Sequence, residues 1–402
     1  MLRWFKHIKA KPVDFLTTML LKRTAYTYFH AISIKTSRLK INDVQTLPNN
    51  TISKHACWIV YDVPDYLNTT PYSNTKCIKL NTFKGTMIHL KNYNNFEDFM
   101  STKFSSKRRA QFKTLEKRLN ISYNITHKII IGNCTLSEFN TLFSALYKML
   151  ETRFIEKEMV NDELPYWNYY KEKIHPLIAN NEAFISVIYA NETPISISVY
   201  MISTNAMYGY LKGYDTNYDK YGLGFLDLIK VTQWAFENNI EVFDFLKGHY
   251  DYKSKWTDTE YYFQKHIVYN SKSPIATTMA HYSKLKINAF YATVSVLKQL
   301  QVDKLLKKGM QWKYNLTHKN SSIIKKQTLV LDTQPIKNLE DHDIQQPIDI
   351  NQEPIPFLKK AVNDFLFSQQ EHIKNINVFL LNKQQQTYLI VGTKNIQVVK
   401  HA

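Results

Sequence analysis

Two short segments of the chain combine glycine with charged and aromatic residues in a pattern that could support chemistry. The first, residues 218–229, reads YDKYGLGFLDLI and has Gly222 and Gly224 at the start of a predicted helix. Two glycines allow a tight turn whose free N–H groups, together with the helix dipole, bind phosphate. Lys220 adds a cation beside them. A tight turn without a ligand is the alternative interpretation.

The second segment, residues 241–256, reads EVFDFLKGHYDYKSKW and follows directly on that unit. Asp244, at a predicted strand end, is a candidate base or a partner that orients Lys253; capping of the next turn is the alternative. Lys253 could stabilise developing negative charge or bind a phosphate, and Tyr252 is a candidate acid. His249 is a candidate for binding the acceptor. A surface lysine, a packed tyrosine and an incidental loop histidine are the structural alternatives.

The densest cluster of positive charge lies in residues 102–119, TKFSSKRRAQFKTLEKRL. Seven basic residues, including Arg108 and Arg109, stand against Glu116 alone, and apolar residues recur at helical spacing. This pattern predicts a basic amphipathic helix that faces an anion or an acidic acceptor. The alternative is a solvated surface helix that docks by its apolar stripe.

Composition limits the remaining possibilities. The 402 residues carry a net charge of +18, only 9 glycines and 3 cysteines, none of them in a CxxC pair. A disulfide scaffold, a zinc ribbon and Gly-rich repeats are therefore excluded, and each glycine becomes informative. The sequence has no GxxxxGK[ST], HExxH or GxSxG motif, so we expect no metal. We also expect a soluble, cytoplasmic protein, because no stretch has the apolar length of a spanning helix.

The order of predicted elements indicates an α+β fold. Strand, helix, helix, three antiparallel strands, helix, strand and strand follow one another between residues 120 and 269. The three central strands are Ala183–Tyr189, Ile195–Ile202 and Asn205–Gly213, and the helices before them begin at Thr135 and Trp167. Thr135 and Glu138 have capping-box spacing. Helix Gly222–Phe236 precedes the two last strands.

The second segment resembles the GNAT superfamily, in particular its FemAB-like and CelD-like acyltransferase branch. The motif of this branch is Asp-Phe-x-x-Gly, then Tyr-Lys, then an aromatic residue. Here it consists of Asp244-Phe245, Gly248, Tyr252-Lys253 and Trp256. The basic helix also looks like the Arg/Lys-rich helix that opens the domain in this branch. The resemblance covers about residues 100–270.

The resemblance implies a GNAT fold, a mixed and mainly antiparallel sheet flanked by helices that holds acyl-CoA between splayed strands. The CoA pyrophosphate would rest on the loop Asp219–Gly224. The cofactor-binding residues would be Lys220, Tyr221, Gly222, Leu223 and Gly224. The usual loop of the superfamily begins with Arg or Gln, and this chain has Asp219 there. That departure favours a donor other than acetyl-CoA or a fold without catalysis. Backbone N–H groups of the strand ending at Gly213 could polarise the acyl carbonyl.

The predicted organisation has six parts, and the fold prediction includes two GNAT-like units in tandem plus a small C-terminal α/β appendage. The parts are a basic helical segment 1–35, a degenerate GNAT-like unit 36–105, the acyltransferase domain 106–272, a basic helical segment 273–330, an acidic Pro-containing linker 331–356 and a C-terminal α/β unit 357–402. The linker has one lysine against six acidic residues between positions 332 and 355.

The leading function prediction is transfer of an acyl group, in the first instance acetyl, from acyl-CoA to an amine. One alternative is a FemAB-like enzyme that transfers an aminoacyl group from charged tRNA to a cell-wall precursor, which the net charge of +18 suits. A third interpretation is a non-catalytic binding protein that keeps the fold. A bacterial origin is implied by the resemblance alone.

Overall fold

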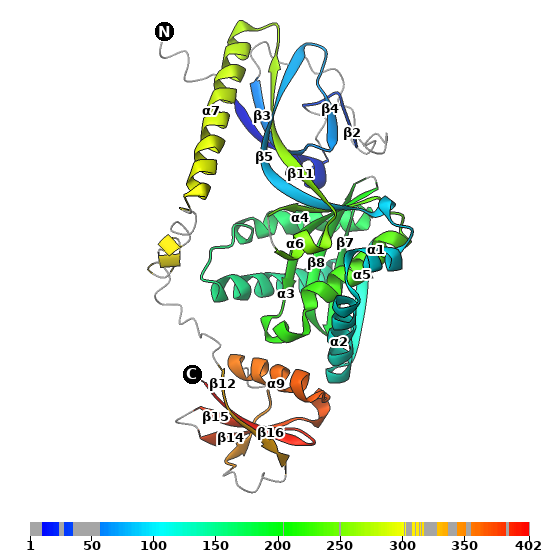
Figure 1. Ribbon diagram of the computed structural model, residues 1–402, viewed down its shortest axis with the longest axis vertical. Coiled ribbons are helices and arrows are strands. Elements are labelled where there is room, and N and C mark those ends of the chain that lie inside the picture. Colours follow the sequence, from blue (N-terminus) through cyan, green and yellow to red (C-terminus); the bar gives the residue numbers. More distant parts are fainter. Residues whose placement is uncertain are drawn as a thin grey trace.

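We analysed a computed structural model of the chain (Figure 1). It describes residues 10–23, 28–34, 57–203, 205–248, 251–300, 328–336, 344–350, 355–382 and 386–401, with residues 302, 308, 309, 311, 312, 314 and 316. The predicted α+β class is confirmed. A large mixed sheet flanked by helices forms most of the described structure, and a smaller sheet forms the C-terminal unit.

The large sheet has nine strands in the order β1-β3-β11-β5-β10-β9-β8-β7-β6 (Figure 1). Its strands are β1 (Lys11–Asp14), β3 (Cys57–Pro64), β5 (Thr75–His89), β6 (Ile125–Ile130), β7 (Ala183–Ala190), β8 (Thr193–Ser203), β9 (Ala206–Tyr214), β10 (Val242–Lys247) and β11 (Thr259–Asn270). Neighbouring strands are antiparallel except β1 with β3 and β9 with β10, which are parallel. The meander β7-β8-β9 matches the three predicted strands.

Helices cover both faces of this sheet. The helices are α1 (Phe96–Lys103), α2 (Ser106–Ser122), α3 (Leu136–Glu156), α4 (Trp167–Ala179) and α5 (Leu223–Glu237). α3 and α4 share one apolar core with the sheet, and α1, α2 and α5 pack in another core on the opposite face. The Thr135 side chain accepts a hydrogen bond from the Glu138 N–H at 3.2 Å, so the predicted helix start is confirmed.

The N-terminal region differs from the prediction. Helices were expected over residues 1–35, but the described part contains β1, a short π-helix η2 (Thr17–Leu21) and β2 (Ala31–Ile34), which pairs with β4 (Leu67–Thr70). Residues 1–9 and 24–27 lie outside the described part. β3 and β5 continue the same large sheet as β7–β10, because β5 lies between β11 and β10. A separate unit over 36–105 stays a prediction.

The C-terminal unit consists of helix α9 (Pro356–Gln369) and a five-stranded sheet in the order β12-β16-β15-β14-β13. Its strands are β12 (Thr328–Pro335), β13 (Gln346–Pro347), β14 (Asn377–Asn382), β15 (Thr387–Val391) and β16 (Asn395–His401). The predicted acidic linker is wrong at its start, since β12 pairs with β16 and closes the sheet. One face of α9 packs on this sheet: the Phe365 ring lies 2.8 Å from where a side chain on Gly392 would begin.

A long helix, α7 (Pro274–Gln299), lies against β11, β5 and β3 along the edge of the molecule (Figure 1). It matches the start of the predicted basic helical segment. Among the described residues, no helix combines the length and the apolarity needed to cross a bilayer.

Candidate active site

The strands β9 and β10 part at the position of Asp244. Their parallel pairing joins Val242 to Ala206, Phe243 to Met207 and Asp244 to Tyr208, and it goes no further within residues 205–248. β9 nevertheless continues to Tyr214 and β10 to Lys247. The register of β10 against β5 shifts after Asp244, and Leu246 takes a left-handed φ of 57°. Beyond Asp244, therefore, each strand has backbone groups that its former neighbour no longer pairs.

Asp244 is completely buried at this point. Its carboxylate accepts hydrogen bonds from the hydroxyls of Tyr66 (2.7 Å) and Tyr261 (2.8 Å) and from the Leu246 N–H (2.7 Å). Burial raises the pKa of Asp244 to about 6, although these three donors and the nearby Lys253 each act to lower it. A carboxyl group with a pKa of about 6 can take up and release a proton near neutral pH.

Lys253 lies on α6 (Asp251–Trp256), and its side chain is buried against the end of β10. The ammonium group donates to the carbonyls of Phe245 and Lys247, both at 2.6 Å. Burial lowers the pKa of Lys253 to about 8, against the attraction of Asp244. The fold thus places Lys253 close enough to Asp244 for their charges to interact.

The remaining motif residues hold α6 in this position. Gly248 has a φ of 104°, which a residue with a side chain rarely adopts, so it allows the chain to turn out of β10. Trp256 is completely buried and packs against Phe104 with ring centroids 4.9 Å apart. His249 lies outside the described residues. Tyr252 lies in α6, but its side chain is not among those described.

Sequence reasoning missed the two tyrosines that bind Asp244. Tyr66 follows β3 and lies 178 residues from Asp244 in the chain, whereas Tyr261 belongs to β11 and lies 17 residues from it. One signal could have indicated Tyr261. Gly85 lies within β5, and a Cβ atom there would come within 2.3 Å of the Tyr261 ring. A glycine inside a strand marks a close approach of another group, and this chain has few glycines.

A second buried carboxylate, Asp227 of α5, was also missed. It accepts hydrogen bonds from Ser186, Ser198, Tyr200 and Lys212 at 2.6 to 2.9 Å. Burial alone would raise the pKa of Asp227, but Lys212 and the hydroxyl donors keep it below its ordinary value. Lys212 also donates to the Gly224 carbonyl at 2.9 Å. This network fixes the first turn of α5 to the sheet.

The predicted phosphate loop has the expected backbone. Residues 216–221 form a 3-10 helix, η6 (Thr216–Tyr221), and Gly222 turns the chain with a φ of 64° into the N-terminus of α5. Leu223 and Gly224 supply the first N–H groups of α5, which have no partner within the helix. Leu223 and Tyr221 are buried.

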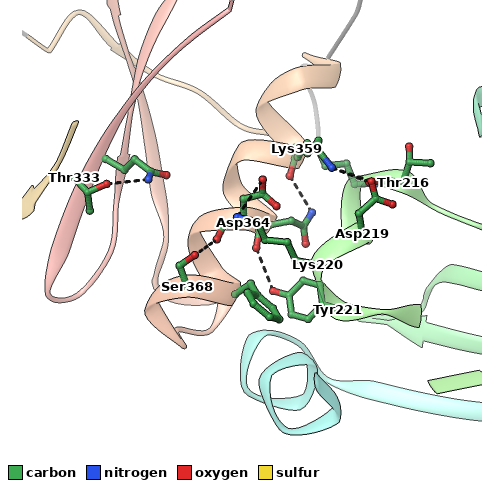
Figure 2. Close-up of polar contacts among 12 residues, drawn as sticks. Thr216, Asp219, Lys220, Tyr221, Thr333, Lys359, Asp364 and Ser368 are labelled. Atoms are coloured by element: carbon green, nitrogen blue, oxygen red, sulfur yellow. Dashed lines mark hydrogen bonds and ion pairs between the residues drawn. The ribbon is translucent and has the colours of Figure 1, made fainter. Parts of the chain in front are cut away.

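Helix α9 of the C-terminal unit covers the outer face of this loop (Figure 2). Lys360 pairs with Asp219 at 3.1 Å, and Lys220 pairs with Asp364 at 3.5 Å. The Tyr221 hydroxyl lies 2.9 Å from the Ser122 hydroxyl and donates to the Asn363 carbonyl at 3.4 Å.

These contacts leave the loop poorly suited to a pyrophosphate. The cation of Lys220 faces the carboxylate of Asp364, and the cation of Lys212 faces that of Asp227. Asp219, where the superfamily has Arg or Gln, adds a negative charge. The residues at this loop therefore do not fit the pyrophosphate of CoA.

The arginines predicted to bind an anion make contacts within the protein. The Arg108 guanidinium lies over the rings of Phe112 (4.7 Å) and Phe225 (4.9 Å). The Arg109 guanidinium donates to the Phe104 carbonyl at 2.7 Å. The exposed cations of α2 are instead lysines, namely Lys107, Lys113 and Lys117.

The geometry can be compared with known proteins. Residues 106–254 match the family described as "Acetyltransferase (GNAT) domain", which confirms the resemblance seen in the motif. No curated protein sequence matches the chain. A solved Bacteroides thetaiotaomicron protein of unknown function aligns with 9% identity and a TM-score of 0.35, over 49% of this chain and 62% of its own length. The chain thus spans less than two thirds of that protein.

Two further solved structures are similar at the same level. The C-terminal domain of a putative lysylphosphatidylglycerol synthetase from Agrobacterium fabrum has 10% identity and a TM-score of 0.37, over 60% of this chain and 72% of that one. FemX has 10% identity and a TM-score of 0.37, over 52% and 72%.

Proposed function

We propose that this chain, which contains a GNAT acetyltransferase domain, transfers an acyl group to an amine next to Asp244. The observation that carries the proposal is the buried Asp244 carboxylate, with a pKa of about 6, at the point where β9 and β10 part. A buried carboxyl group that titrates near neutrality is rare in a purely structural role and common at reaction centres. The transferase class follows from the GNAT domain, and the residues of the centre are our assignment.

The proposed step is attack of the amine nitrogen on the acyl carbonyl carbon. The new C–N bond forms, the bond from the carbonyl carbon to the sulfur or oxygen of the donor breaks, and the amine loses one proton. That proton passes to the hydroxyl of Tyr66 or Tyr261, while the same hydroxyl gives its own proton to Asp244. The leaving group recovers a proton from Asp244 by the reverse path.

The carbonyl oxygen becomes negatively charged during the attack and needs donors. Alternate N–H groups of β9 beyond Tyr208 point into the gap left by β10, and fixed backbone donors of this kind stabilise an oxyanion. The Lys253 ammonium adds a positive charge beside the gap and holds the carbonyls of Phe245 and Lys247 in place. Lys253 therefore positions β10 and favours the charged transition state.

The donor is a separate question. Acyl-CoA is the donor implied by the resemblance, but the loop at Gly222 does not favour its pyrophosphate. The second candidate donor, an aminoacyl ester on tRNA, is favoured by the net charge of +18 and by the exposed Lys107, Lys113 and Lys117. Replacing these three lysines by Gln should weaken tRNA binding and reduce its salt dependence, whereas an unchanged salt slope would count against this donor.

The non-catalytic interpretation is the remaining alternative. It rests on Asp219 in place of the usual Arg or Gln, and the poor fit of this loop, where Asp219 pairs with Lys360, to a pyrophosphate supports it. Buried, titratable Asp244 and Lys253 count against it, because uncharged residues would pack more favourably at these positions in a binding protein.

The test is transfer to a panel of primary amines, with acetyl-CoA and with charged tRNA as donors, followed by mass spectrometry. We expect Asp244→Asn to lower kcat/KM at least 100-fold, within the range for loss of general acid–base catalysis. Tyr261→Phe should lower it less, because Tyr66 keeps a second path. The exposed Asp258→Asn is the matched control and should retain activity. Full activity of Asp244→Asn would refute the assignment.

A further inference from the structure

The loop that begins α5 has a second partner within the chain, and this contact has its own chemical character. α9 presents one face to the loop, at positions 359, 360, 363, 364 and 367, which are spaced as neighbours on a helix. Phe365, at an intervening position, packs against the small sheet, and the apolar residues of α9 form one core that also includes Tyr218, Tyr221 and Leu223. The five positions listed above carry two lysines, an asparagine, an aspartate and a phenylalanine.

The charges on the two surfaces are complementary. The loop carries Asp215 and Asp219, and α9 places Lys359 at 3.0 Å from the first and Lys360 at 3.1 Å from the second. Lys220 is the exception and faces Asp364. Residues 215–222 thus have two acidic side chains and one basic one, a net charge of −1. Such a surface suits a cationic partner and repels a phosphate.

Besides the ion pairs, Asn363 and Phe367 of α9 make further contacts with the region around the loop. Asn363 accepts from the Tyr123 hydroxyl at 2.8 Å, and both side chains are less than a tenth exposed. The Phe367 ring lies 5.2 Å from that of Tyr221 and 4.5 Å from the Arg118 guanidinium, which also donates to the Phe367 carbonyl at 3.2 Å. Polar groups that would be orphaned without α9 are satisfied here.

We propose that the loop Asp215–Gly222 is a dedicated docking site for the chain's own C-terminal unit and binds no donor phosphate, whether or not α9 is docked. The proposal rests on the proposed function in one respect, namely that this chain binds an acyl donor. It explains why Asp219 stands where the superfamily has Arg or Gln, because Lys360 needs an anionic partner. It also implies that the molecule that carries the acyl group binds to another surface of the chain.

The experiment uses the full chain and measures two quantities, the radius of gyration in solution and the melting temperature with and without millimolar CoA. Lys360→Glu combined with Phe367→Ser removes an ion pair, creates a repulsion with Asp219 and empties the aromatic contact. We expect this variant to expand and to gain no thermal shift with CoA. Adding Asp219→Lys should recover part of the compact state. Lys374→Glu, the same charge change at an exposed position of the same unit, is the control.

Three results would overturn the proposal. The first is a rise of several degrees in the melting temperature of the wild-type chain when CoA is added, if Gly222→Asp abolishes that rise. The second is the appearance of such a rise in the Lys360→Glu/Phe367→Ser variant, which would make α9 a displaceable lid over a cofactor site. The third is an unchanged radius of gyration in that variant. None of these readouts depends on acyl transfer, so an inactive reaction centre would leave this test intact.

Discussion

Asp244→Asn is expected to lower the rate of transfer at least 100-fold while leaving the protein at least as stable at neutral pH. The pKa of the Asp244 carboxyl is about 6 in the folded chain, well above the ordinary aspartate pKa of about 3.9. Because a tenfold change in proton affinity corresponds to about 1.4 kcal/mol, the charged carboxylate destabilises the folded state by about 3 kcal/mol at pH 7.5. Asparagine removes that charge. It replaces one accepting oxygen by a donor, which costs about 1 kcal/mol for a rearranged hydrogen bond.

The sign of the pH dependence follows from the raised pKa. Between pH 4 and pH 6 the folded state binds more protons than the unfolded state, so the contribution of Asp244 to stability falls as pH rises through this window and is constant above it. Asp244→Asn should therefore gain about 1–2 kcal/mol over wild type at pH 7.5 and nothing at pH 4. Urea unfolding at the two pH values measures the difference.

Two results would refute this reasoning. A loss of several kcal/mol at pH 7.5 would make the carboxylate a structural acceptor for Tyr66, Tyr261 and the Leu246 N–H. An identical difference at both pH values would mean that Asp244 has an ordinary pKa. Asp162→Asn, at an exposed carboxylate, controls for the general effect of removing one negative charge.

Two further substitutions probe the groups around this centre. Gly85→Ala places a methyl group 2.3 Å from the Tyr261 ring, so it should displace the Tyr261 hydroxyl from Asp244. We expect this substitution to lower the rate of transfer and to destabilise the chain by about 1–3 kcal/mol. Combining it with Tyr261→Phe should add little further loss of activity, and independent losses in the double variant would contradict a proton path that both substitutions interrupt. Asp227→Ala leaves the partly buried Lys212 without its carboxylate partner and should destabilise by about 3–5 kcal/mol. The pKa of Asp227 is lowered, so its contribution is fully present above the ordinary carboxyl pKa and decreases as the pH falls below it; a stability difference that does not shrink at all between neutral and strongly acidic pH would contradict that account.

Most elements of the central domain could be predicted from the sequence. Helix α4 begins at Trp167, as predicted, and β7, β8 and β9 differ from prediction by one or two residues at their ends. Local periodicity and caps are enough for these elements, since each has one apolar face in a core. The expected N-terminal helices were only partly correct, because residues 15–21 are helical and bring Phe15 and Leu20 into the core of the large sheet, whereas residues 11–14 and 31–34 form strands.

The motif from Asp244 to Trp256 predicted part of the centre. A buried strand end, a turn glycine and an anchoring tryptophan are local features, and the sequence places them together in 13 residues. The hydrogen-bond partners of Asp244 could not be predicted from the sequence. The pairing of β3, β5 and β11 brings Tyr66 and Tyr261 to Asp244, and hydrophobic periodicity does not specify which strands pair. The same holds for β12, which joins its last five residues, predicted as linker, to three residues predicted as the end of the basic helical segment.

By itself, the sequence determined the class of fold, the strand–loop–helix unit around Gly222 and the placement of Asp244 and Lys253 near the end of one strand. These depend on neighbours in the chain, whose side-chain types and backbone freedom act over a few residues. The tertiary structure alone decided that the Asp244 carboxyl is buried among tyrosine hydroxyls and that the loop faces α9. The burial that raises the pKa of Asp244 and the contact that covers the loop both need segments far along the chain, since Tyr66 lies 178 residues from Asp244 and Lys360 lies 141 residues from Asp219.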